Sequence, residues 1–150
     1  MHIPPFDNRN AAIVGIDDPD VPLTYLNIVR LTRGETFTSD VPGYETALVP
    51  ADGTIDVEVV GPEGRATTFE GVGARSSIWE GDPSAVYVPV GSTATMTCAS
   101  ERTEVFVAGA RFSERYEPFV VRPDQIDFVQ YGSDDTKTHR KIKHILGRSP

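Results

Sequence analysis

Short segments with alternating apolar and polar residues fill the middle of this chain, and they limit its fold more than any other feature. In TIDVEVV (residues 54–60) and TATMTC (residues 93–98) apolar residues alternate with polar ones, which is the period of a β-strand that buries one face. Further segments of this kind are TYLNIVRLT, TALV, AVYV, TEVFVAGA and IDFVQY. The pattern predicts a domain built from short strands.

Turn signals separate these segments, namely ADG, GPEG, GDPS and PVG. Asp52-Gly53 suits a two-residue hairpin loop, and Gly91 suits the last position of a type I turn. Roughly seven short strands at regular spacing, with almost no helical periodicity before residue 135, indicate an antiparallel sandwich or barrel. We expect an all-β closed jelly roll. An immunoglobulin-like sandwich fits the same alternation, because alternation does not set the strand order.

Length and charge limit the class of protein. A chain of 150 residues is one domain by its length and can fold around an ordinary core without disulfides or metals. Its 14 Lys and Arg against 22 Asp and Glu give a net charge of -8, which repels phosphate backbones and anionic lipids. We therefore expect no nucleic acid or membrane partner. Small molecules or other proteins remain as candidate partners.

Cysteine content and the N-terminus indicate the compartment. Cys98 is the single cysteine, so an internal disulfide and a multi-thiolate metal site are excluded, and the composition fits a reducing compartment. The first 20 residues lack the features of a secretory leader. No apolar run approaches the roughly 18 residues of a membrane span. These features predict a cytoplasmic protein in which Cys98 is a buried, unreactive thiol.

The character of the chain changes at Phe112. FSERYEPFVVRPDQIDFVQYG is typical of a connecting arm with one late strand, and the following SDDTKTHRKIKHILGRSP is rich in Lys and Arg. Ile142, Ile145 and Leu146 have the i, i+3, i+4 spacing of one helical turn that could dock. We expect this C-terminal tail, from about residue 134, to be more mobile than the rest.

The stretch GETFTSDVPGYETALVPADG (residues 34–53) resembles the first motif of the cupin superfamily of jelly rolls. That motif has a glycine, a His-x-His pair, a glutamate and a second glycine, and a second motif has Pro-x-Gly followed by a histidine. The matching residues are Gly34, Glu45, Gly53, Pro89 and Gly91. The histidine positions fall on Asp40, Pro42 and Ala94. Because Pro42 and Ala94 have no donor atom, we expect no metal site.

Three longer segments, RLTRGETFTSD, EGVGARSSIWEGDPSAVYVPVGSTATMT and THRKIKHIL, resemble the N-terminal half of the 5-deoxy-glucuronate isomerases of inositol catabolism. The family positions in the middle segment are matched by Gly73, Arg75, Gly81, Pro83, Tyr87, Pro89 and Gly91. Those enzymes are bicupins, and the resemblance implies an aldose–ketose type isomerisation of a deoxy-glucuronate at a divalent metal. Their metal ligands belong to the second cupin, and no position here matches them.

The resemblance implies three parts: an N-terminal arm at residues 1–22, a cupin β-barrel at residues 23–111, and a connecting arm at residues 112–150 toward an absent second cupin. We expect no catalytic residue, no metal ligand and no cofactor in this chain. Residues that could contact a ligand at the barrel are Glu45, Arg75, Trp79 and Tyr87, with Tyr25 as a further aromatic.

Two alternatives apply to Glu45. Either its side chain is exposed to solvent just before a strand, or it points into the barrel and its burial is offset by a partner such as Arg75. His139 and His144 are expected to be solvated in the basic tail, and His2 lies in the N-terminal arm. None of the three histidines is expected to bind a metal.

The sequence therefore favours a structural, metal-free first cupin that pairs with a second cupin domain or with another copy. A free-standing cupin that binds a small sugar or carboxylate is the first alternative. An interaction module for a separately encoded catalytic cupin is the second. A barrel lined with polar groups would favour the binder, and a barrel filled by Val, Ile, Phe and Trp would favour the structural role.

Overall fold

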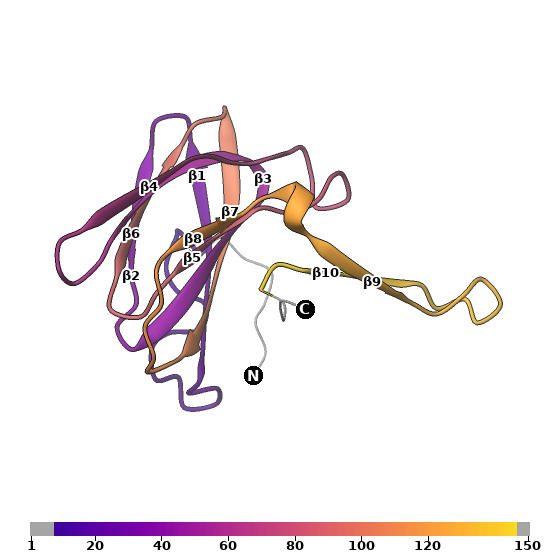
Figure 1. The fold of residues 1–150 in the computed structure, drawn as a ribbon, viewed down its shortest axis with the longest axis horizontal. Helices are drawn as coiled ribbons and strands as arrows, with labels where there is room; N and C mark the ends of the chain where they lie inside the picture. Colours follow the sequence, from indigo (N-terminus) through magenta and orange to yellow (C-terminus); the bar gives the residue numbers. More distant parts are fainter. Residues whose placement is uncertain (1–7, 147–150) are drawn as a thin grey trace.

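The computed structural model describes residues 8–146, and its regular structure is almost entirely antiparallel β-strand (Figure 1). The elements are β1 (Thr24–Thr32), β2 (Thr36–Asp40), β3 (Tyr44–Val60), β4 (Ala66–Arg75), β5 (Ala85–Val88), β6 (Thr93–Cys98), β7 (Arg102–Arg111), β8 (Phe119–Val121), the short 3-10 turn η1 (Pro123–Gln125), β9 (Asp127–Tyr131) and β10 (Arg140–His144). The all-β prediction is confirmed. No helix in the described range is long and apolar enough to cross a membrane.

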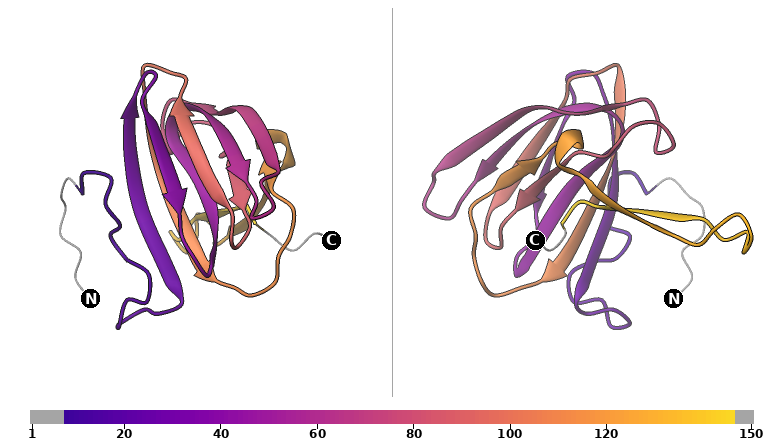
Figure 2. Two further views of the ribbon diagram at one scale, coloured as in Figure 1. Left: turned by 90° about the vertical axis from the view of Figure 1, so that its left-hand side faces the viewer. Right: turned by 45° about the vertical axis from the view of Figure 1, so that its right-hand side comes forward.

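Strand β3 belongs to both sides of the barrel. Its first half pairs with β7 and β5 in the strand order β1-β7-β3-β5-β8, and its second half pairs with β6 and β4, with β2 beyond β6. Figure 2 shows the two sides facing each other. We refer to them as the β1 sheet and the β2 sheet. Together they enclose the core.

The change of sheet occurs at Asp52-Gly53, where a hairpin loop was predicted. That prediction is wrong, since β3 continues through both residues. The ladder with β7 is irregular here, and an Asp52 carboxylate oxygen accepts the Glu104 amide at 2.7 Å. Gly53 has φ of 70°, and a Cβ there would collide with the Arg102 carbonyl. Asp-Gly therefore forms a bend within one strand, a geometry that requires the same positive φ as a turn.

The core lies between the two sheets and is filled by aliphatic side chains. Its fully buried members come from both sheets and include Val29, Leu48, Ile55, Val57, Val59, Val72, Val86, Met96, Val105 and Val107. The alternation read from TATMTC is confirmed, because Ala94, Met96 and Cys98 are buried and the intervening threonines are not. Cys98 is 1% exposed and is a free thiol, as predicted.

The segment after β7 differs from the prediction in two ways. It contains three strands instead of one, and β8 joins the edge of the barrel by pairing with β5. The helical turn predicted at Ile142 to Leu146 is wrong, because residues 140–144 form β10 and Ile142 pairs with Val129 of β9. In RKIKH, Lys141 and Lys143 alternate with Arg140, Ile142 and His144, a period of two that suits a strand, although the spacing of Ile142, Ile145 and Leu146 suits a helix. This hairpin extends to one side of the barrel (Figure 1).

The expected domain boundaries remain predictions. Strand β1 begins at Thr24 and β7 ends at Arg111, close to the expected barrel limits. On the N-terminal side, Val14 bridges Leu26 of β1, and the Asn8 amide donates to the Asn27 side-chain oxygen at 2.8 Å. His2 lies outside the described residues. The segment before β1 therefore extends the sheet along its edge.

Candidate functional site

The barrel interior is where the cupin metal motif would place its ligands. Of the aligned positions, Asp40 and Pro42 are exposed, and only Ala94 is buried. The residues that point inward are Ser39 and Val41, 5% and 6% exposed, and Ser39 pairs with Ala94 across β2 and β6. At Asp40 and Pro42 the alignment by spacing is therefore one residue out of phase with the inward positions, and a shift of one residue moves a side chain to the opposite face.

The inward positions do not fit a divalent metal. Ser39 contributes one hydroxyl, which has no hydrogen-bond partner in the described part of the chain, while Val41 and Ala94 contribute no donor. Within residues 8–146 no three His, Cys, Asp or Glu side chains gather where they could hold a metal ion. Transition metals in proteins need several nitrogen, sulfur or carboxylate ligands. No metal chemistry can therefore be assigned to this barrel.

Glu45 lies on the outer face of β3 and not in the barrel. It accepts a hydrogen bond of 2.6 Å from the Tyr87 hydroxyl, so the pairing with Arg75 considered from the sequence is not formed. Burial, together with the bond to Glu45, raises the pKa of Tyr87 above its ordinary value. The Tyr87 ring stacks on Phe119 at 4.8 Å between centroids. An open cleft of about 330 Å³ beside them is also lined by Phe112, Tyr116, Ile145 and Leu146.

Arg75 and Trp79 lie in a second cleft, of about 880 Å³, between the loop after β4 and the β9–β10 hairpin. Trp79 is 88% exposed. The Arg75 Nε donates to the Pro50 carbonyl at 3.2 Å, and burial lowers the pKa of its guanidinium. Across the cleft, Lys143 pairs with Asp82. The four residues predicted near one barrel pocket are thus divided between two clefts, and no residue lining either cleft belongs to the core cluster.

The remaining candidates have structural surroundings. Tyr25 is 9% exposed and belongs to the core cluster. Its ring therefore packs in the core and does not line a ligand site. His139 is exposed and its Nε2 is 2.7 Å from an Asp134 carboxylate oxygen in the hairpin turn. His144 is exposed at the end of β10.

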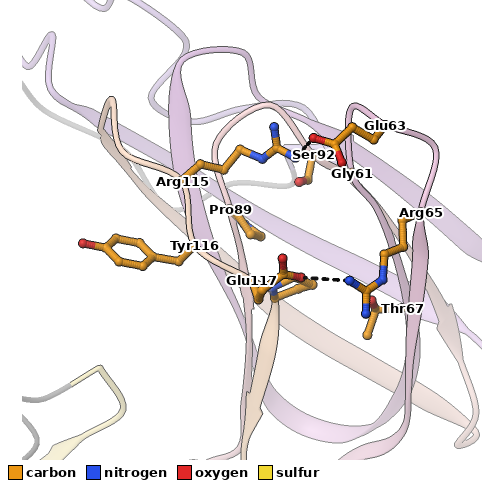
Figure 3. Close-up of a pocket in the computed structure, with 10 residues that line it drawn as sticks. Gly61, Glu63, Arg65, Thr67, Pro89, Ser92, Arg115, Tyr116 and Glu117 are labelled. Carbon is orange, nitrogen blue, oxygen red and sulfur yellow. Dashed lines mark hydrogen bonds and ion pairs between the residues drawn. The ribbon is translucent and has the colours of Figure 1, made fainter.

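A polar cleft at the β3–β4 turn was missed by the sequence reasoning (Figure 3). Here the segment before β8 crosses the turn, and two ion pairs join them: Arg115 with Glu63 at 3.3 Å and Arg65 with Glu117 at 3.9 Å. The cleft holds only about 60 Å³. Because the partners are largely exposed, the pairs add little stability. They position the segment and leave no room for a sizeable ligand.

Arg122, directly after β8, fastens the other end of this strand to β4. Its two terminal nitrogens donate to the carbonyls of Gly71 and Glu70, both at 2.9 Å. A planar guanidinium suits such a double contact. Nothing in the local sequence identifies this contact, because the two carbonyls are backbone groups about fifty residues away.

The outer face of the β1 sheet is apolar. One row of paired residues crosses every strand of this sheet: Leu26, Ala108, Ala47, Tyr87 and Phe119. A neighbouring row contains Ile28, Phe106 and Val49. We call these eight residues the apolar face. Ala108 is exposed and Phe119 is 42% exposed, so that part of the face is open to a partner.

Comparisons with solved structures support the cupin-type fold. An IolB-like protein from Salmonella typhimurium LT2 matches with a TM-score of 0.73 and 22% identity over 83% of this chain. A putative glyoxylate-induced protein from Pseudomonas aeruginosa matches with a TM-score of 0.52 and 12% identity over 76% of this chain. An oxalate decarboxylase mutant from Bacillus subtilis matches with a TM-score of 0.50 and 18% identity over 65%. At these identities the likeness shows the fold alone.

The match covers only part of those proteins, namely 44%, 40% and 24% of their chains. A comparison with curated proteins gives no match. The predicted cupin-type jelly roll is confirmed, and the immunoglobulin-like alternative is not supported. The KduI/IolB family model matches residues 2–150, and the chain belongs to this family.

Proposed function

We propose that this chain is a non-catalytic cupin of an isomerase of the KduI/IolB family and supplies packing surface instead of catalytic residues. The reaction implied for the whole protein is an aldose–ketose type isomerisation of a deoxy-glucuronate. In this proposal the divalent metal and its ligands belong to a second cupin. Family membership supports the reaction class, and the composition of the barrel interior supports the division of labour.

The observation that carries the proposal is the filled core. Leu48, Ile55, Val57 and Met96 are each fully buried between the sheets. No charged residue is buried within residues 8–146, and the buried polar residues there are Asn27, Ser39, Thr46, Ser84, Ser92 and Thr103. A site for a sugar acid needs converging polar groups that orient the ligand. The interior offers no such set, so a free-standing cupin that binds a sugar inside its barrel is the weaker alternative.

The apolar face supports a protein partner. Its two rows run across adjacent strands, which is the form of a surface that a second sheet can cover. We propose a second cupin as the occupant, either a further domain or a second copy of this chain. A separately encoded catalytic cupin would use the same face, so the interaction-module alternative differs only in how the partner is encoded. Cytoplasmic location remains a prediction from composition.

The purified chain alone tests this proposal. We expect dialysed protein to contain no stoichiometric Zn, Mn, Fe or Ni, and we expect no turnover of 5-deoxy-glucuronate. A family member that carries the histidine set, assayed in parallel, shows that substrate and conditions are adequate. About one metal per chain together with metal-dependent conversion would overturn the proposal and would make this barrel a catalytic one.

A further inference from the structure

The cleft between the loop after β4 and the β9–β10 hairpin is unusually cationic for this protein. Its lining contains Arg75, Lys141 and Lys143 together with His139, and it contains no Asp or Glu. The whole chain has a net charge of -8. A positive cleft in an acidic protein concentrates anions locally.

Arg75 and Lys141 form no ion pair within residues 8–146, although the Asp82 carboxylate acts electrostatically on Arg75. Lys143 forms an ion pair with Asp82 and donates a hydrogen bond of 3.0 Å to the Gly81 carbonyl. These two contacts join the hairpin to the loop. The terminal nitrogens of Arg75, by contrast, have no hydrogen-bond partner in the described part of the chain, although its Nε is held by Pro50. Lys141 has no ion-pair partner in that part either. A half-buried guanidinium whose terminal nitrogens make no hydrogen bond is unfavourable unless a ligand or water compensates it.

The backbone beside Arg75 is also strained. Ala74 has φ of 88°, a conformation that residues with a Cβ rarely adopt and that often occurs at functional sites. The turn that follows is compact, since Ser77 bridges Glu80 and its hydroxyl accepts the Trp79 amide at 3.2 Å. This turn holds the exposed indole at the rim of the cleft.

We propose that this cleft binds a small organic anion, with Arg75 and Lys141 on the anionic group and Trp79 against the flat face of the molecule. A guanidinium forms paired hydrogen bonds with a carboxylate or a phosphate. An indole stacks on an apolar ring face and gains from burying its large surface. A cleft of about 880 Å³ admits a molecule of this size. The site lies outside the barrel and goes beyond the packing role proposed above.

Fluorescence gives a direct test, because Trp79 is the single tryptophan of the chain. Glucuronate, glucose 6-phosphate and cyclohexanecarboxylate serve as probes that do not absorb at the excitation wavelength, and glucose serves as the neutral control. We expect a saturable blue shift with at least one anion at millimolar concentration and none with glucose. The probe that saturates distinguishes a carboxylate site from a phosphate site.

Variants locate the site. Arg75→Gln and Lys141→Gln should each weaken binding about tenfold. Arg140→Gln is the matched control, because Arg140 neighbours Lys141 on β10 but lies on the opposite face and does not line the cleft. Lys141 is exposed, so its variant tests the site even if Arg75→Gln disturbs the loop. The proposal is overturned if no anion gives saturation, or if Arg140→Gln weakens binding as much as Lys141→Gln. It is also overturned if the shift depends on protein concentration alone, since a second copy would then cover Trp79.

Discussion

The outer faces of the two sheets have opposite chemistry although the sheets share one strand. On the β1 sheet, the row across the strands is Leu26, Ala108, Ala47, Tyr87 and Phe119. On the β2 sheet, the corresponding row is Thr38, Thr95, Glu58 and Thr68. We call this second row the polar face. Both sheets turn aliphatic residues inward, so the difference lies entirely in the residues that point away from the core.

The composition of the two faces therefore indicates that one faces water and the other faces a partner. Threonine and glutamate in a row suit a sheet surface that remains in water, because β-branched polar residues satisfy strand geometry without adding apolar area. A row of Leu, Ala and aromatic residues gains nothing from water and indicates a covered surface. The inside of the barrel is needed for folding, whereas the apolar face is available for association. Four substitutions, with their control and partner variants, can break or sharpen this comparison.

The largest effect is expected in the interior that both sheets share. Leu48→Ala removes a fully buried side chain of β3 and leaves a cavity, which should lower the free energy of unfolding by about 2–5 kcal/mol. Urea unfolding followed by circular dichroism measures this loss. A change below about 1 kcal/mol would show that the interior is loosely packed and could admit a ligand.

The next effect separates the two faces by association. Ala108→Arg places a charge in the exposed part of the apolar face, and burying that charge against a partner is unfavourable by about 2 kcal/mol or more. We expect the chain to form a dimer that this variant dissociates, as measured by light scattering across protein concentrations in physiological salt.

Thr95→Arg is the matched control on the polar face, since Thr95 lies at the corresponding outward position of β6. It should leave association unchanged. If Thr95→Arg dissociates the dimer and Ala108→Arg does not, the roles of the two faces are reversed. A chain that is monomeric at every concentration would show that its apolar face is not a self-association surface.

A smaller effect concerns the Tyr87 hydroxyl on the apolar face. Tyr87→Phe keeps the ring that stacks on Phe119 but removes the bond to Glu45, at about 1–2 kcal/mol. The raised pKa of Tyr87 means that folding favours the neutral phenol. This stabilisation is complete below the ordinary tyrosine pKa of about 10 and is lost as the pH rises above it.

Urea unfolding from neutral pH to above about pH 10 tests this linkage. In Tyr87→Phe the free energy of unfolding should fall less steeply with rising pH than in the parent chain. Part of the loss should persist, because burial also raises the pKa of Tyr25. Tyr131→Phe, at an exposed position of β9, is the control and should keep the parent slope. An unchanged slope in Tyr87→Phe would contradict the linkage.

The strands could be predicted from the sequence because one buried face imposes a period of two on each of them. Strand β9 was among them, as IDFVQY. Strand β10 could not be predicted, since Ile142, Ile145 and Leu146 satisfy a helical spacing while Arg140, Ile142 and His144 satisfy a strand spacing. The choice between them depends on pairing with Val129, which is tertiary information. At Asp52-Gly53 a bend within a strand and a hairpin turn require the same residue types.

The candidate site was less predictable than the fold. Glu45 was located to the correct strand start, but its face depends on the phase of β3, and one residue of slip moves it from the barrel to the outside. Tyr87 and Arg75 lie near each other in the sequence, yet the structure places them in different clefts. The contacts of Arg122 with backbone carbonyls leave no sequence pattern at all.

The smallest effect is expected on the polar face, where the hydroxyls of Thr38 and Thr95 lie 3.1 Å apart. Thr38→Ala removes one of them, and the other can bond to water because this pair is exposed. The loss should be about 0.5 kcal/mol or less. A double-mutant cycle with Thr95→Ala isolates the coupling between the two hydroxyls. A coupling above about 1.5 kcal/mol would mean that water does not replace the lost bond. The polar face would then be covered like the apolar one, and the contrast between a solvated sheet and a partner-binding sheet would fail.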